Sequence, residues 1–257
     1  MVYTNIKTQI IMKNYIIFLL VFIGTVSIFG QSRFDHSTWD QALLLNVLDN
    51  GKVNYEGFMK DSSLLYTYFQ ELSENSPNDS WSREEQMAYW INAYNAYTIK
   101  LVIDSYPIKS IKDLKNPWDE KFFKIDGEWF SLNDLEHRIL RKFGDPRIHF
   151  AINCASNSCP VVWNRAYTGE NLVASLDNQA RRYINDPNNN LITKNTYKLS
   201  KIFSWFKKDF RKNGKTEISF INTYSHIKII NQTSAGSMDY DWGLNEVTTP
   251  IPSIVLD

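Results

Sequence analysis

Hydrophobic and polar residues recur with a helical period along much of the chain. The longest helix is predicted from Gln86 to Tyr106, because Ser82 and Glu85 form a capping box and no breaker occurs before Pro107. Apolar side chains occupy most of its circumference: Met87, Trp90, Ile91, Tyr94, Tyr97, Leu101 and Val102. A helix that is apolar on all sides runs through a core, so we expect this one at the centre of the fold.

The sequence before and after this helix predicts several shorter helices and strands. Amphipathic patterns and caps predict helices over 37–48, 64–72, 131–143, 168–184 and 202–210. Short apolar runs predict hairpins from 122–125 with 128–130 and from 191–192 with 197–199, and strands over 148–153, 217–222 and 226–230. The pattern predicts an α+β fold, a single helix-rich domain with short, mostly antiparallel strands around a long buried central helix.

The first 30 residues have the pattern of an export signal. Lys13 precedes an apolar run from Tyr15 to Phe29, which is short for a membrane span and is followed by no stop-transfer charges. We expect residues 1–30 to be removed, with Met12 as a second candidate for the true start. An uncleaved anchor is the alternative. The mature chain is predicted to be periplasmic or secreted, with no stable membrane span after cleavage.

The charge and composition of the chain indicate which class of molecule it binds. The chain has 28 basic and 28 acidic residues, and loss of the signal removes Lys7 and Lys13 but no acid. A charge near zero or slightly negative gives no footprint for nucleic acid. Without linkers, repeats or low-complexity runs, residues 31–257 are predicted to form one globular domain. A peptide, amide or glycan is the expected ligand.

Reactive side chains concentrate in residues 145–160. This stretch holds Arg147, His149 and the only two cysteines, Cys154 and Cys159. Because a turn follows the strand predicted over 148–153, Cys154 falls where the backbone changes direction, a common position for a nucleophile. In an exported protein the two cysteines can equally form a disulfide. Their spacing lacks the paired pattern of a zinc site, so no metal or cofactor is predicted.

Two histidines compete to be the base that serves Cys154. Glu136 falls inside the apolar stripe of the helix predicted over 131–143, and His137 lies on its flank. A buried carboxylate needs a partner. Glu136 either forms a structural contact with Arg147, His149 or a residue of the long helix, or it orients a catalytic histidine. In a strand, the odd separation of His149 from Cys154 points the two side chains to opposite faces, which favours His137.

Two amides are predicted to lie buried on the long helix. Asn92 and Asn95 are three positions apart, and a buried amide without partners costs about 1–3 kcal/mol. They either tie neighbouring loops to the helix or act in a site, by orienting a base or donating to an oxyanion.

Several blocks of the sequence resemble family 547 of the domains of unknown function. The resemblance spans about residues 60–245 and is carried by 90–96, 136–141, 147–154, 158–160 and 240–242. It implies an exported bacterial member, since bacterial members are often exported. The resemblance also implies that family members sometimes replace the equivalent of Cys159 but tend to retain that of Cys154. This favours a role for Cys154 other than forming a disulfide with Cys159.

The residues together predict an exported cysteine-dependent hydrolase or acyl transferase that acts on a peptide, isopeptide or amide bond. Cys154 would attack, His137 or His149 would take its proton, Glu136 would orient that histidine, and Asn92 or Asn95 would polarise the carbonyl or support the base. Arg147 and Trp242 are the predicted substrate-binding residues. Histidine follows cysteine in papain-like enzymes, so a permuted papain or transglutaminase-like arrangement would be required.

A non-catalytic module is the alternative. In that interpretation Trp163 and Trp242 hold an extracytoplasmic partner and a Cys154–Cys159 disulfide is structural. A thiol redox protein, in which both cysteines are essential, is a third interpretation.

Overall fold

The computed structural model describes residues 34–230 and 233–247, which belong to one compact unit. The predicted export signal, with Met12, lies outside the described residues. Within the described ranges no helix is long and apolar enough to cross a membrane.

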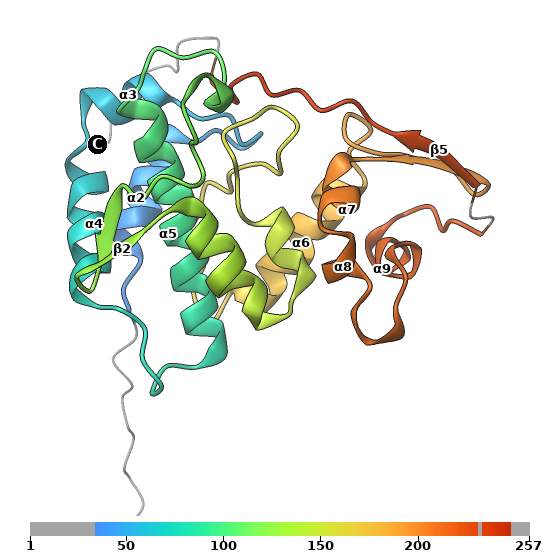
Figure 1. The fold of residues 1–257 in the computed structure, drawn as a ribbon, viewed down its shortest axis with the longest axis horizontal. Coiled ribbons are helices and arrows are strands. Elements are labelled where there is room, and N and C mark those ends of the chain that lie inside the picture. The colour runs from blue at the N-terminus through green and yellow to red at the C-terminus, as the bar shows by residue number, and fades with distance from the viewer. Residues whose placement is uncertain (1–33, 231–232, 248–257) are drawn as a thin grey trace, which may run out of the picture. The chain divides into compact units, whose positions relative to one another are not determined.

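The long helix predicted at the centre of the fold is confirmed as α5 (Arg83–Ile103). Ser82 Oγ accepts a hydrogen bond from the Glu85 backbone, and the Glu85 carboxylate accepts one from the Ser82 backbone, so the predicted capping box is present. The helix ends three residues earlier than predicted, and it is buried along its length. Three helices, α2 (Ser37–Asn46), α3 (Tyr55–Lys60) and α4 (Ser63–Glu74), pack around it and around each other (Figure 1).

The hairpin predicted around Asp126 and Gly127 is also confirmed. Strands β1 (Phe123–Ile125) and β2 (Glu128–Phe130) pair antiparallel, and both turn residues have the positive φ that a tight hairpin turn requires. Phe123 stacks on Tyr97 of α5, with ring centroids 3.7 Å apart, which holds the hairpin against the central helix.

The helix predicted over 131–143 forms with an unusual geometry. A π-helix, η2 (Asp134–Ile139), leads into a 3₁₀ helix, η3 (Leu140–Phe143), which Gly144 ends in a left-handed conformation. The predicted orientation holds, since Glu136 is buried and His137 is exposed. π-helical turns are rare in proteins, and those that occur are often found at functional sites.

The strand predicted over 148–153 is wrong. The segment is a 3₁₀ helix, η4 (Pro146–Phe150), because Asp145 caps the Arg147 backbone and Pro146 occupies the first helical position. Ile148, His149 and Phe150 are all buried. The strand alternation that would point His149 away from Cys154 is therefore absent.

The chain after residue 170 forms a second buried cluster around Phe150. The elements that contribute to it are α6 (Leu172–Ile184), β3 (Leu191–Ile192), β4 (Thr196–Leu199), α7 (Lys201–Trp205), α8 (Lys207–Phe210) and α9 (Glu217–Tyr224), whereas β5 (Thr233–Ser237) is exposed. The β3–β4 hairpin is confirmed, whereas β5, which pairs parallel to β4, was not predicted. The strand predicted over 217–222 is wrong because a capping box of Thr216 and Ser219 begins α9 there. No strand forms over 226–230.

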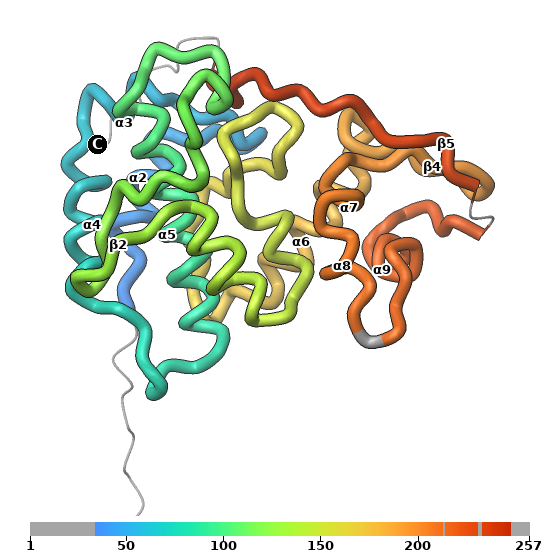
Figure 2. The backbone as a smooth tube through the Cα atoms, viewed as in Figure 1, coloured from blue at the N-terminus to red at the C-terminus, as the bar shows by residue number. Residues whose placement is uncertain are grey.

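The last described residues return to the N-terminal part of the chain (Figure 2). Leu244 bridges Ser156, and Glu246 bridges Val53. The helix-rich α+β class is confirmed, with two separate small sheets. A permuted papain-like arrangement is not confirmed.

Candidate functional site

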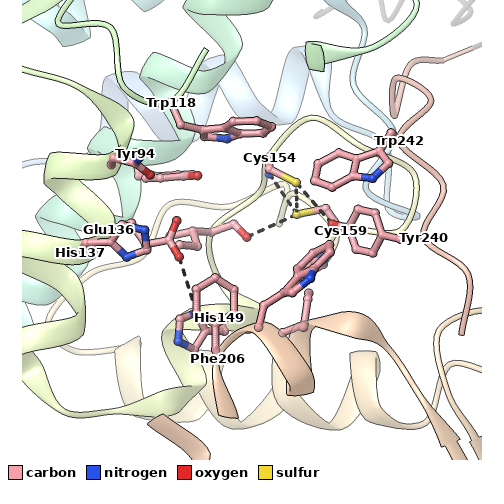
Figure 3. A pocket seen from close by; sticks show the side chains of 15 residues that line it. Tyr94, Trp118, Glu136, His137, His149, Cys154, Cys159, Phe206, Tyr240 and Trp242 are labelled. Carbon is pink, nitrogen blue, oxygen red and sulfur yellow. Dashed lines mark hydrogen bonds and ion pairs between the residues drawn. The ribbon is translucent and has the colours of Figure 1, made fainter. Parts of the chain in front are cut away.

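Cys154 lies at the wall of a pocket of about 220 Å³ (Figure 3). Segments distant in the sequence line it: η2, η4, the loop after η4, α7 and residues 240–242. The aromatic and titratable side chains of its lining are Tyr94, Trp118, Glu136, His137, His149, Cys154, Cys159, Trp205, Phe206, Tyr240 and Trp242.

Asn95 and Asn153 fix the backbone that presents Cys154. The Asn95 amide donates to the Ala151 carbonyl and accepts from the Asn153 N–H, both at 2.9 Å. Asn153 in turn donates to the Pro160 carbonyl at 2.6 Å and accepts from the Ala155 N–H at 2.7 Å. Ala155 has a left-handed φ of 59°, so the chain turns sharply directly after the cysteine.

The thiol of Cys154 is surrounded by hydrogen-bonding groups. Both cysteines are free, and their sulfur atoms share a hydrogen bond of 2.9 Å. Ser156 Oγ lies 3.2 Å and Tyr240 Oη 3.4 Å from the Cys154 sulfur. The hydrogen bond from Cys159 lowers the pKa of Cys154 to about 7, helped by Ser156 and Tyr240 and opposed by burial. Burial and the neighbouring sulfur raise the pKa of Cys159, so Cys154 is the thiol that ionises first.

Glu136 faces the same pocket with an unpartnered oxygen. Its side chain is buried, and Oε1 has no hydrogen-bond partner in the described chain. Burial, and then the negative charge of Cys154, raise the pKa of Glu136 to about 7, against the opposing effect of Arg141. A carboxylate on Glu136 and a thiolate on Cys154 would both be negative and would repel each other. The ionised form of one group therefore favours the protonated form of the other.

His149 connects Glu136 to a buried ion pair. Its Nε2 lies 2.9 Å from Asp209 Oδ2, and the same carboxylate accepts two hydrogen bonds from Arg141, at 2.7 and 3.1 Å. Its Nδ1 lies 3.9 Å from Glu136 Oε1, and its ring stacks on Phe206 with centroids 3.8 Å apart. Burial lowers the pKa of His149, although Asp209 acts in the opposite direction, so the ring is neutral near pH 7.

His137 lies at the pocket but makes different contacts from those predicted. Its Nδ1 is 3.1 Å from Arg141 Nη1, and burial and the Arg141 charge lower its pKa. Within the described residues, no hydrogen bond joins His137 to Glu136, and none joins Cys154 to either histidine. The histidine beside Glu136 is His149, one of its two predicted histidine partners, with Nδ1 3.9 Å from Oε1.

The two predicted amides have structural contacts. Asn92 donates to the Tyr167 carbonyl at 2.7 Å, accepts from the Tyr167 N–H at 3.1 Å and lies 3.2 Å from His36 Nδ1. Neither Asn92 nor Asn95 lines the pocket. Both tie loops to α5.

Of the two predicted substrate-binding residues, one lines the pocket and the other does not. Arg147 is paired with Asp145 at 2.6 Å and with Asp177 at 2.7 Å and does not line the pocket. Trp242 does line the pocket. Trp163, the other tryptophan of the binding alternative, packs on Tyr167 at 5.1 Å and is not part of the lining.

Several site residues escaped the sequence analysis. Asp209 and Arg141 carried only the weak signal of charges within predicted helices, and Trp205 was one aromatic residue within the helix predicted over 202–210. Tyr240 stands in a block that carried the family resemblance, but nothing in the sequence indicated its contact with Cys154. Among residues 34–230 and 233–247, no group of three or more histidine, cysteine, aspartate or glutamate side chains could hold a metal ion.

Comparison with known proteins identifies the family. Residues 78–184 match the family model DUF547, described as a protein of unknown function. The match supports membership of the chain in this family. No curated protein and no solved structure matches it. The DUF547 segment is shorter than the predicted span of 60–245. It holds Glu136, His149 and both cysteines, whereas Asp209 and the block at 240–242 lie beyond it.

The hydrogen bonds to Cys154 predict the pH at which it reacts. We expect iodoacetamide to alkylate Cys154 with a rate that rises through a midpoint near pH 7, because the lowered pKa exposes thiolate there. The Cys159→Ala variant removes the strongest stabilising contact and should move the midpoint to higher pH. Tyr240→Phe should move it by less. Mass spectrometry of the alkylated peptide measures the rate, and a midpoint unchanged in both variants would contradict the assignment.

The Asn95 contacts predict a large structural effect. Asn95→Ala leaves a buried carbonyl and a buried N–H without partners, so we expect the free energy of unfolding to fall by about 2–4 kcal/mol. Urea denaturation followed by circular dichroism measures the change. Asn75→Ala, which removes one exposed hydrogen bond to Glu71, is the control and should change stability by under about 1 kcal/mol. Equal losses in both variants would contradict the role given to Asn95.

Proposed function

We propose that the protein is an exported cysteine-dependent hydrolase or acyl transferase that acts on a peptide, isopeptide or amide bond, with Cys154 as nucleophile. One observation carries the proposal. The thiol with a lowered pKa and the buried carboxyl of Glu136, with its unpartnered oxygen, line one aromatic pocket. A nucleophile and a titratable group with pKa values near 7 in one cleft are typical of a catalytic site.

Neutral donors support the thiolate in this proposal. Cys159, Ser156 and Tyr240 stabilise the charge on Cys154, so the thiolate forms near neutral pH without an adjacent imidazolium. The thiolate attacks the substrate carbonyl carbon and forms a tetrahedral intermediate. The same three groups donate less to sulfur as its charge moves to the carbonyl oxygen.

Glu136 replaces histidine as the proposed proton donor. While Cys154 is a thiolate, its charge keeps Glu136 protonated, and the carboxyl can then protonate the leaving amine. The bond from carbon to nitrogen breaks, and an acyl group remains on Cys154 as a thioester. The Glu136 carboxylate then takes a proton from the water or the amine that attacks the thioester. Burial keeps His149 neutral against the opposing effect of Asp209, and its Nδ1 lies 3.9 Å from Glu136 Oε1.

Cys154→Ser tests the catalytic part of the proposal. We expect the wild-type protein to release aminomethylcoumarin from members of a library of N-acetyl aminoacyl coumarin amides, with either water or hydroxylamine as acceptor. Cys154→Ser should reduce turnover to the rate without protein, and Glu136→Gln should reduce it by about 10²–10⁴-fold.

The control for this test is Cys159→Ser. The hydroxyl can still donate to the Cys154 sulfur, so this variant should keep turnover with a changed pH profile. Loss of turnover in both cysteine variants would favour a redox function. A ligand bound equally well by wild type and Cys154→Ser, with no turnover in either, would favour the binding module.

The export part of the proposal rests on residues 1–30 alone. We expect the protein recovered from the periplasm or the culture fluid of its host to begin close to Gln31, because the signal is removed during export. N-terminal sequencing measures this. Recovery of the intact chain with Met1 or Met12 still present would contradict cleavage.

A further inference from the structure

Two buried acceptor atoms face each other at the deep side of the pocket. Glu136 Oε1 and His149 Nδ1 are 3.9 Å apart, and neither has a hydrogen-bond partner in the described chain. Glu136 and His149 are 7% and 2% exposed. Buried polar atoms without partners are rare in folded proteins, so this pair calls for an explanation.

The surroundings of His149 decide that its Nδ1 is an acceptor. The Asp209 carboxylate has only acceptor atoms, and it lies 2.9 Å from Nε2. The hydrogen bonds from Arg141 and His149 outweigh burial and hold the pKa of Asp209 well below its usual range. Nε2 of the neutral ring therefore carries the hydrogen, and Nδ1 presents a lone pair toward Glu136. Two acceptors in one place are satisfied by a group with several N–H donors.

The walls of the pocket favour a positive charge on that donor. Trp118, Trp205, Trp242, Phe206 and Tyr94 line it, and no lysine or arginine does. The faces of aromatic rings attract cations. Trp242 already holds one, since Lys112 Nζ lies 4.8 Å from the centre of its ring. Figure 3 shows the labelled aromatic rings around the space between Glu136 and Cys154.

We propose that the pocket binds a primary alkylammonium group, which donates hydrogen bonds to Glu136 and His149 while its alkyl chain lies against the aromatic rings. This inference rests on the proposed function and names the substrate class of that site. The amine is the acceptor, or in the reverse direction the leaving group, of acyl transfer at Cys154. A pocket of about 220 Å³ has room for one side chain of the lysine type, which makes an isopeptide the natural product.

The transfer balances with the groups present. The ammonium gives one proton to the Glu136 carboxylate, and its nitrogen attacks the carbonyl carbon of the thioester. The bond from carbon to the Cys154 sulfur breaks as the bond from carbon to nitrogen forms. The second amine proton passes to sulfur, so the products are an amide, the Cys154 thiol and protonated Glu136.

Binding of small probes to the Cys154→Ser variant tests the proposal without chemistry. Isothermal titration calorimetry should show n-butylammonium binding about ten- to a hundredfold more tightly than n-butanol, since its charged N–H groups meet two acceptors. Tetramethylammonium, a cation without N–H donors, should bind more weakly than n-butylammonium. Equal binding of n-butylammonium and n-butanol, or of the two cations, would overturn the proposal.

Two substitutions with matched controls locate the site. Glu136→Gln should weaken n-butylammonium binding by about tenfold or more, whereas Glu71→Gln, at another carboxylate with a buried unpartnered oxygen, should not. Asp209→Asn should also weaken binding, because the amide can donate to Nε2 and move the His149 hydrogen to Nδ1. Its control is Asp177→Asn, which alters an ion pair outside the pocket. Thermal melts check that each variant is folded, and unchanged binding in folded Glu136→Gln and Asp209→Asn would overturn the proposal.

The two proposals fail separately in these experiments. Amine binding that disappears while the coumarin amides are still cleaved would remove the amine site and keep the nucleophile. Amine binding with no turnover on any amide would keep the site and remove the catalytic role of Cys154.

Discussion

The hydrogen bonds of Asn95 join the central helix to the backbone that carries the thiol, and the geometry of the pocket depends on them. A primary amide is the side chain suited to this contact because it satisfies a carbonyl and an N–H at once. Since α5 is buried along its length, Asn95 has a fixed position, and residues 151–153 are fixed with it. The turn at Ala155 can then hold Cys154 against Tyr240, which lies 86 positions further along the chain.

A second constraint is that the pocket cannot hold two negative charges at low cost. Cys154 and Glu136 each have a pKa of about 7, and the charge of the ionised Cys154 raises the pKa of Glu136. Near neutral pH the pair therefore holds a thiolate together with a carboxylic acid, or a thiol together with a carboxylate. These are the two forms that the first and second halves of an acyl transfer need. The ion pair of Arg141 and Asp209 sets the tautomer of His149, and its two charges act in opposite directions on the pKa of Glu136.

The sequence was informative where a pattern was long or chemically specific. The capping box of Ser82 and Glu85, the turn at Asp126 and Gly127, and the burial of Glu136 all follow from local chemistry and were predicted. The segments 148–153 and 217–222 were misassigned because a short apolar run fits a buried strand and a buried helical turn equally well. The capping residues that decide between them, Asp145 and Thr216, lie just outside each run.

The site was predictable only in part, because several of its contacts join residues that are distant in the sequence. Cys154, Glu136 and His149 stand close together in the sequence, and each carries an evident reactive group. Their decisive partners are distant, since Asp209 is 60 positions from His149 and contributes one buried carboxylate among many acidic residues. The hydrogen bond of His137 to Arg141 is likewise a contact that no periodicity records.

The asymmetry between the two cysteines explains why one of them can be a nucleophile without a histidine partner. Cys159 is 7% exposed, its pKa is raised, and its sulfur accepts a hydrogen bond from the Cys154 N–H at 3.0 Å. It therefore stays protonated and has a hydrogen to donate to the Cys154 sulfur. Cys154 faces the pocket and receives that hydrogen together with those of Ser156 and Tyr240. Because all three donors are neutral, they stabilise the thiolate without adding a positive charge, which leaves the charge of Cys154 free to act on Glu136 and on a bound cation.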